Sequence, residues 1–160
     1  MRLIVFSDTH GNLAVIDQII TSNPISDHFL FLGDGIKEFE IVSMKYPEKH
    51  FYSVIGNCDK GGAPEEAVVE IYNTRIYMAH GHLLGVRNSL DRLIDNARAA
   101  KADIALFGHT HIRYYQQDKG LYILNPGSAF LPEDDLPPSY AFIDINITGI
   151  GCAHVDLLDN

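Results

Sequence analysis

Five short clusters of polar residues in this chain carry side chains of the types that can bind metal ions. They are Asp8-Thr9-His10, Gly33-Asp34-Gly35, Gly56-Asn57-Cys58-Asp59, His80-Gly81-His82 and Gly108-His109-Thr110-His111. Five of the 8 histidines in the chain lie in these clusters. Desolvating so many carboxylates and imidazoles together is costly unless a cation pairs with them. The clusters therefore predict a shared metal site.

The number of candidate ligands predicts more than one ion in that site. Seven side chains qualify, namely Asp8, His10, Asp34, Asn57, His80, His109 and His111. One zinc or manganese ion takes fewer ligands than this from a protein while it keeps a position for water. Two ions need a bridging group, which a carboxylate with two oxygens can supply. Mixed oxygen and nitrogen donors suit Mn²⁺, Fe²⁺ or Zn²⁺ without choosing among them.

Each cluster directly follows a short apolar run that reads as a buried strand. The five runs are Leu3 to Phe6, Phe29 to Leu32, Phe51 to Ile55, Arg75 to Ala79 and Ile104 to Phe107. In open α/β sheets, binding residues gather at the carboxyl ends of the strands. We therefore expect the five clusters to meet at one edge of the fold.

Helical patterns separate several of these strands and predict an α/β protein with a covered sheet. The apolar positions are Leu13, Ile16, Ile19 and Ile20 after an N-cap at Asn12, then Ile36, Phe39 and Val42, then Val86, Leu90, Leu93, Ile94 and Ala97. A hairpin turn is expected at Asn73-Thr74. Later strands are expected at Ile112 to Gln117, Leu121 to Leu124, Tyr140 to Ile145 and Ile150 to Leu157.

Length and charge limit the classes of function. The 160 residues, of which 46% are hydrophobic, predict a single folded domain over residues 1–160. The net charge of −9 disfavours stable binding to duplex nucleic acid. We see no secretory signal and no membrane span, and with only two cysteines, Cys58 and Cys152, we expect a cytoplasmic protein with free thiols.

The five clusters, in this order, resemble those of the calcineurin-like metallophosphoesterases. The Asn57-Cys58-Asp59 segment, the small size and the Asn125-Pro126-Gly127-Ser128 segment are similar to the short bacterial and archaeal phosphodiesterase branch of that family. The resemblance covers most of the chain. It implies a four-layer αββα sandwich, in which two facing mixed sheets are flanked by helices.

The resemblance also implies a role for each candidate ligand. One ion would be held by Asp8, His10 and His111, and the other by Asn57, His80 and His109, with Asp34 bridging the two. The family's third cluster usually reads Gly-Asn-His, and its histidine assists the chemistry near the leaving group. Cys58 stands in that place here, which leaves the general acid open.

Five further residues or groups receive interpretations from the residues themselves. His82 either fixes His80 or reaches the leaving oxygen as a substitute acid. We interpret Cys58 as a small hydrophobic residue rather than a nucleophile. Asp59 is expected to cap the loop that follows it. Asn57, with the backbone groups after Asp34 and Asn57, is expected to position the phosphate, and Gly127-Ser128 to form a turn that supports the site.

These observations predict a phosphodiesterase that hydrolyses small phosphodiesters by attack of a hydroxide bridging two divalent ions. Mn²⁺ is the first candidate, and Fe²⁺, Zn²⁺ and Ni²⁺ are alternatives. The rival hypothesis is a non-catalytic metal-binding scaffold, because the retromer scaffold subunit resembles the same branch. A metallo-β-lactamase-like hydrolase, suggested by His109-x-His111, is disfavoured because no Asp-His pair follows. Association into a homodimer is left open.

Overall fold

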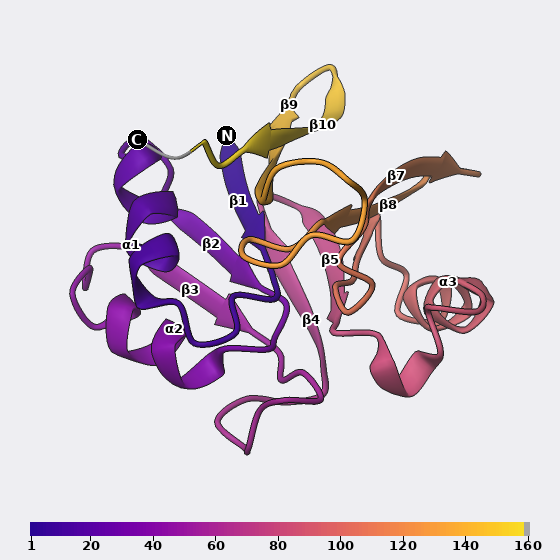
Figure 1. The fold of residues 1–160 in the computed structure, drawn as a ribbon. Coiled ribbons are helices and arrows are strands. Elements are labelled where there is room, and N and C mark those ends of the chain that lie inside the picture. The colour runs from indigo at the N-terminus through magenta and orange to yellow at the C-terminus, as the bar shows by residue number, and fades with distance from the viewer. Residues whose placement is uncertain (159–160) are drawn as a thin grey trace.

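The computed structural model describes residues 1–158 and contains two five-stranded sheets (Figure 1). The first sheet has the order β10-β9-β1-β2-β3, and its strands are β1 (Arg2–Phe6), β2 (His28–Phe31), β3 (His50–Ser53), β9 (Ser139–Asn146) and β10 (Gly149–Asp156). The second sheet has the order β4-β5-β6-β8-β7, with β4 (Glu66–Ile71), β5 (Thr74–Ala79), β6 (Ile104–Leu106), β7 (Arg113–Asp118) and β8 (Leu121–Pro126). Both sheets mix parallel and antiparallel pairs.

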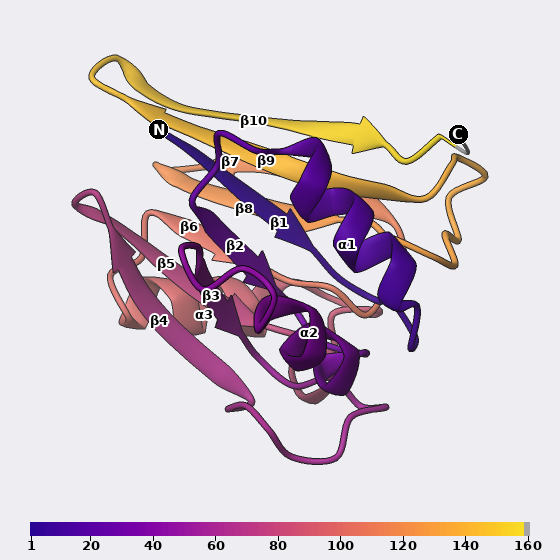
Figure 2. The ribbon, with the colours of Figure 1, turned by 90° about the vertical axis from the view of Figure 1, so that its left-hand side faces the viewer.

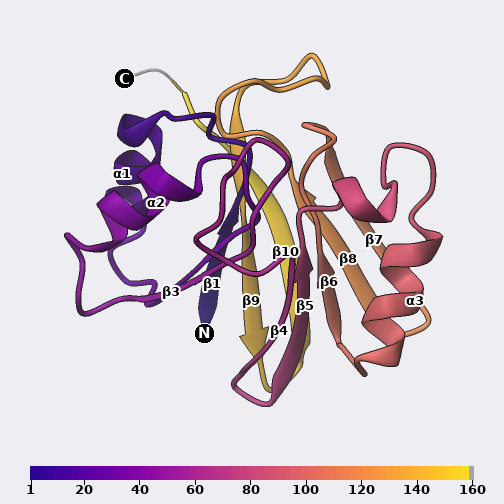
Figure 3. The same ribbon diagram turned by 90° about the horizontal axis from the view of Figure 1, so that it is seen from below.

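Helices cover the outer faces of the two sheets, so the layers run helix, sheet, sheet, helix (Figure 3). Helices α1 (Leu13–Ser22) and α2 (Ile36–Ser43) lie against the first sheet, and α3 (Asp91–Ala99) lies against the second. A short 3₁₀ helix, η1 (His82–Leu84), precedes α3. The expected four-layer αββα sandwich is confirmed. In the part of the chain that is described, no helix is long and apolar enough to cross a membrane.

Alternation along β1 shows how one strand fills two hydrophobic layers. Leu3 and Val5 pack between the two sheets, whereas Ile4 and Phe6 pack under α1 and α2, and all four are fully buried. Successive side chains of a strand point to opposite faces, so a strand covered on both faces reads as a continuous apolar run. Burying one such side chain contributes about 1.5–3 kcal/mol.

Two local predictions differ from the structure. The β4–β5 hairpin turns at Tyr72-Asn73 rather than at Asn73-Thr74, with φ angles of 51° and 58° that are typical of a type I′ turn. Helix α3 begins at Asp91 rather than near Val86. Gly85 has a left-handed φ of 68° and ends η1, so the apolar positions before Asp91 lie in turns rather than in a continuous helix.

The strand directions bring the polar clusters to one end of the sandwich. Strands β1, β2 and β3 run parallel in the first sheet, and β5 and β6 run parallel in the second. Figure 2 shows β1, β2 and β3 pointing the same way, toward the loops that follow them. Because each cluster follows one of these five strands, the clusters lie at the carboxyl ends of strands from both sheets.

Candidate metal centre

The first sheet supplies the carboxylates of the site. Asp8 follows β1 and Asp34 follows β2, and their exposed fractions are 0% and 2%. Asp34 Oδ1 accepts a 2.8 Å hydrogen bond from the backbone N–H of Cys58, and Asp8 Oδ2 accepts one of 3.2 Å from the N–H of His109. Asp8 Oδ1 is buried and accepts no hydrogen bond from the residues described. A buried carboxylate oxygen without a partner is costly unless a cation binds it.

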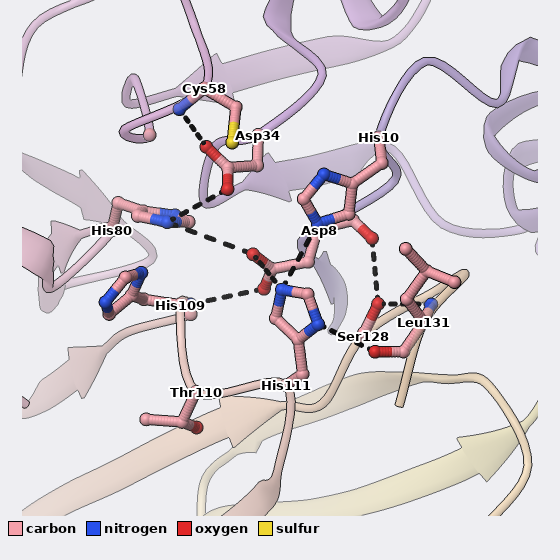
Figure 4. Close-up of polar contacts among 12 residues, drawn as sticks. Asp8, His10, Asp34, Cys58, His80, His109, Thr110, His111, Ser128 and Leu131 are labelled. Atoms are coloured by element: carbon pink, nitrogen blue, oxygen red, sulfur yellow. Dashed lines mark hydrogen bonds and ion pairs between the residues drawn. The ribbon is translucent and has the colours of Figure 1, made fainter. Parts of the chain in front are cut away.

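The second sheet supplies imidazoles whose orientation is fixed by main-chain carbonyls. His80 Nδ1 donates to the carbonyl of Leu32 at 2.7 Å, and His111 Nδ1 donates to the carbonyl of Leu131 at 2.7 Å. Since a carbonyl only accepts, both Nδ1 atoms carry the proton. In each neutral ring Nε2 is therefore an acceptor with its lone pair directed into the site (Figure 4).

These lone pairs converge on one another. His80 Nε2 lies 3.1 Å from Asn57 Oδ1, 3.5 Å from Asp34 Oδ2 and 3.9 Å from Asp8 Oδ1. His111 Nε2 lies 3.3 Å from Asp8 Oδ1 and 3.2 Å from His10 Nε2. Acceptors placed this close repel each other unless protons or cations lie between them.

The same spacing fits divalent ions. Two ligands that are each about 2.0–2.2 Å from a shared ion lie roughly 3.0–3.5 Å apart in tetrahedral or octahedral geometry. Three groups of side chains have donor atoms within 4.8 Å of one another, namely Asp8 with His10 and His111, His10 with Asp34 and Cys58, and Asp8 with Asp34 and His80. The orphaned Asp8 oxygen and this donor set show that the residues suit a metal centre.

The carboxylates also shape the proton affinities in the site. Burial works to raise the pKa of Asp34, but His80 and the Cys58 N–H outweigh burial and hold that pKa well below its usual range. The nearby Asp8 carboxylate raises the pKa of His111. Burial opposes charge on His80, yet Asp34 and Asp8 raise its pKa. The site therefore attracts positive charge.

Most of the predicted ligands stand on strained backbone. Five of the seven have left-handed φ angles, namely Asp8 (55°), His10 (45°), Asp34 (61°), His109 (67°) and His111 (57°). Residues other than glycine rarely adopt this conformation, and strain of about 1–3 kcal/mol per residue is retained mainly where function needs it. The strain turns each side chain at the end of its strand toward the common centre.

Asp59 has a larger role than the loop cap that we expected from the sequence. Its carboxylate accepts four backbone N–H groups at 2.8–3.0 Å, those of Asp34, Gly35, Ile36 and Gly56. Asp59 therefore ties the loop after β2 to the loop after β3 and caps the start of α2. A Cβ at Gly56 would collide with Asp34 Oδ1, so glycine is needed where these loops meet. The sequence showed only an acidic residue in a loop.

This arrangement corrects the prediction that backbone groups after Asp34 and Asn57 position the phosphate. The N–H groups of Gly35 and Ile36 donate to Asp59, and the N–H of Cys58 donates to Asp34. They are used inside the protein. Of the groups expected to hold the phosphate, the exposed Asn57 side chain at the mouth of the site remains.

The loop between β8 and β9 holds two residues of the site by hydrogen bonds, as predicted for Gly127-Ser128. Ser128 Oγ donates to the Asp8 carbonyl at 2.8 Å and accepts the N–H groups of Phe130 and Leu131. The Leu131 carbonyl in turn orients His111. One turn thus holds the backbone of a first-sheet ligand and the ring of a second-sheet ligand.

Three predicted residues lie at the periphery of the cluster. The His109 ring centroid is 5.2 Å from that of His80, and the His82 ring packs edge-on against His80 at 5.4 Å. His80 Nδ1 is bound by Leu32 rather than by His82, and His82 Nδ1 is buried without a hydrogen bond among the described residues. Cys58 is exposed at the rim. Arg87, which the sequence did not single out, donates to the His109 carbonyl at 3.0 Å.

Buried carboxylates and imidazoles at the carboxyl ends of two facing sheets are the arrangement expected of a metal-dependent phosphoesterase. The model of the calcineurin-like phosphoesterase superfamily domain matches residues 1–148, and this chain belongs to that family. The chain is 31% identical over 147 residues to the probable metallophosphoesterase YsnB of Bacillus subtilis, covering 91% of this chain and 85% of the relative. It is 26% identical over 175 residues to the phosphodiesterase YfcE of Escherichia coli, covering 94% and 91%.

Solved structures share the fold. A predicted phosphoesterase from Streptococcus pneumoniae aligns with a TM-score of 0.84 at 25% identity, covering 97% of this chain and 88% of that one. Vps29 of Entamoeba histolytica, solved in complex with Zn²⁺, aligns with a TM-score of 0.73 at 25% identity, covering 98% and 99%. Enzyme-named relatives and a vacuolar protein sorting protein are thus both similar to this chain.

Proposed function

We propose that this protein is a phosphodiesterase that uses two divalent ions to hydrolyse small phosphodiesters. The observation that carries the proposal is the convergence of acceptor atoms, in which His80 Nε2 faces Asn57 Oδ1 and Asp34 Oδ2 at 3.1 and 3.5 Å. The family membership and the name of the relative YfcE support phosphodiester hydrolysis. Mn²⁺ is our first candidate for the ions, and the oxygen and nitrogen donors of the predicted ligand set are equally compatible with Fe²⁺ and Zn²⁺.

The predicted ligands divide into two sets around Asp34. Asp8, His10 and His111 would hold one ion, and Asn57, His80 and His109 the other, with Asp34 between them. When bound, a pair of ions lowers the pKa of water and polarises the phosphoryl oxygens for in-line attack. Asp34 keeps its negative charge at neutral pH, because His80 and the Cys58 N–H depress its pKa.

The other residues of the chain orient these groups and limit the substrate. The carbonyls of Leu32 and Leu131 keep His80 and His111 in the tautomer that binds through Nε2. Asn57 is exposed and can contact a phosphate oxygen at the mouth. The net charge of −9 leaves few cations to hold a long polyanion, so the substrate is a short diester.

The experiment measures metal content, stability and hydrolysis on metal-stripped protein. We expect two ions to bind per chain, and chelation to lower the melting temperature. Each ion present at a hundredfold excess over its Kd stabilises the fold by about 2.7 kcal/mol, and chelation removes that stabilisation. Bis-p-nitrophenyl phosphate should be hydrolysed faster than p-nitrophenyl phosphate in a panel of Mn²⁺, Fe²⁺, Zn²⁺ and Ni²⁺. His80→Gln should lose both metal and activity, whereas the exposed His50→Gln should keep both.

A metal-binding scaffold is the second candidate, and one surface feature favours it. Leu83, Ile112 and Leu131 are exposed large hydrophobic residues, and they lie next to the predicted ligand segments. The similarity to Vps29, which binds Zn²⁺ in its solved complex, agrees with metal binding without settling catalysis. Stoichiometric metal binding with no hydrolysis of any diester under all four ions would favour the scaffold.

A further inference from the structure

Cys58 lies in the loop after β3, at the rim of the metal centre, and its thiol faces two predicted ligands. Its Sγ, an imidazole nitrogen of His10 and a carboxylate oxygen of Asp34 all lie within 4.8 Å of one another. Figure 4 shows the sulfur beside the Asp34 carboxylate, on the side of His10. The thiol therefore occupies the position of a donor atom in a three-residue group rather than that of a packed hydrophobic side chain.

The backbone around Cys58 is fixed to the site. The Cys58 N–H donates to Asp34 Oδ1 at 2.8 Å. Its neighbour Asp59 binds the N–H groups of Asp34 and Gly56, each at 2.8 Å. Because the main chain on both sides of the residue is held by Asp34 and Asp59, the closeness of Sγ to Asp34 does not depend on a flexible loop.

The neighbouring amide treats the sulfur as an acceptor. Asn57 Oδ1 faces His80 Nε2 at 3.1 Å, and Asn57 Nδ2 donates to Cys58 Sγ at 3.5 Å. The amide of Asn57 therefore directs its oxygen toward His80 and its NH₂ group toward the sulfur of Cys58.

We propose that the Cys58 thiolate is an additional ligand of the ion held beside His10 and Asp34, and that it biases this position toward thiophilic ions. This inference rests on the metal centre of the proposed function and deepens it. The thiol proton is released to solvent as the sulfur–metal bond forms. Soft thiolate ligands select Zn²⁺, Co²⁺ and Fe²⁺ over Mn²⁺ more strongly than oxygen ligands do.

Cobalt gives a direct readout, because a thiolate bound to Co²⁺ produces an intense charge-transfer absorption in the near ultraviolet. We expect this band when metal-stripped protein is titrated with CoCl₂, and we expect Cys58→Ser to lose it. Cys152→Ser is the matched control, since Cys152 is the other free cysteine and lies in β10. This variant should keep the band at full intensity.

A competition experiment measures the selectivity. The ratio of Zn²⁺ to Mn²⁺ affinity, determined against a chromophoric chelator, should fall by about 10-fold in Cys58→Ser and stay unchanged in Cys152→Ser. Circular dichroism and Co²⁺ stoichiometry establish that each variant is folded and loaded. Absence of the band from the loaded wild-type protein, or its persistence in Cys58→Ser, overturns the proposal.

Diester hydrolysis by the same cobalt-loaded samples separates this inference from the proposed function. A wild-type protein that hydrolyses bis-p-nitrophenyl phosphate without showing the band refutes only the ligation by Cys58. A protein that shows the band and hydrolyses no diester supports the ligation while refuting the phosphodiesterase.

Discussion

The two sheets contribute different chemistry to the candidate metal centre. The first sheet gives Asp8 and Asp34, whose oxygens accept backbone N–H groups, while Asp59 anchors the main chain around Asp34. The second sheet gives His80 and His111, whose rings donate to backbone carbonyls. One half therefore carries the negative charge, and the other supplies neutral donors of fixed tautomer.

This difference indicates how the site can hold cations in an acidic protein without collapsing when they leave. Negative charge in the first half is stabilised by N–H dipoles, and the imidazoles of the second half can take up protons because Asp8 and Asp34 raise the pKa values of His80 and His111. Replacing a carboxylate of the first half should therefore alter the charge of the site and its chemistry. Replacing Asp59, which holds the main chain around Asp34, should alter the affinity for metal. The predictions below test that distinction.

The largest effect is expected for Asp34→Asn, which removes the charge between the two predicted ligand sets. A neutral amide bridges two cations poorly, so we expect diester turnover to fall by at least about 10³-fold, or about 4 kcal/mol in the barrier. Asp95→Asn, at an exposed position of α3, is the control and should retain activity. Near-wild-type turnover with two ions still bound per chain would contradict the bridging role.

Asp59→Asn should act through the support of the first half rather than through charge at the centre. Its amide NH₂ faces N–H donors, so the loops after β2 and β3 should separate, and metal affinity should fall by about 10–100-fold. Asp103→Asn is the matched control, because Asp103 Oδ2 also accepts a backbone N–H, that of Arg75, at 2.8 Å.

Asp59→Asn and Asp103→Asn each lose a carboxylate that accepts backbone N–H groups, so both should lower the melting temperature. Metal affinity, measured by competition titration, should change in Asp59→Asn alone. Equal affinities in the two variants would show that Asp59 stabilises the fold without positioning the site.

Cys58→His tests the rim where the family usually carries histidine. Burial and the nearby carboxylate of Asp34 raise the pKa of the thiol, which makes it a poor proton donor partner near neutral pH. Imidazole, with an ordinary pKa of about 6.5, should speed the hydrolysis of alkyl esters by about 10-fold and change p-nitrophenyl esters little. The comparison needs matched metal occupancy, and equal effects on both substrates would place Cys58 away from the leaving group.

The smallest effect concerns salt. Because the net charge is −9 and Arg87 is already paired with Glu133 and the His109 carbonyl, few cations are free to bind a polyanion. Hydrolysis of a short diester should vary by less than about twofold between 50 and 200 mM salt. A loss of activity with salt as steep as that of a protein that contacts many phosphates would contradict this prediction.

The sequence was sufficient to predict which residues meet, because each cluster follows an apolar strand and parallel strands end at the same edge. Asn12 was also predictable as an N-cap, and its Oδ1 accepts the Val15 N–H at 3.1 Å. The second sheet was predicted from the resemblance to a known family rather than from the pattern of apolar residues. Nothing in the sequence near Arg2 indicates that β1 pairs with β9, because the residue opposite Arg2 is Asp144, near the other end of the sequence.

The role of Asp59 could not be predicted for a different reason. A carboxylate in a loop accepts whichever N–H groups the surrounding turns present, and those turns depend on left-handed angles at Asp34 and glycine at Gly56. Likewise, the β4–β5 turn moved by one residue because Tyr72 adopts a positive φ that its residue type does not favour. Both outcomes depend on tertiary packing.

The order of the strands has a consequence for synthesis on the ribosome. The second sheet is built from one continuous segment, β4 to β8, whereas the first sheet joins β1, β2 and β3 to β9 and β10 from the end of the chain. One edge of β1 therefore stays unpaired while the whole second sheet is translated. An open strand edge is a template for association with other chains. The nascent chain is thus most vulnerable to aggregation until its last hairpin emerges.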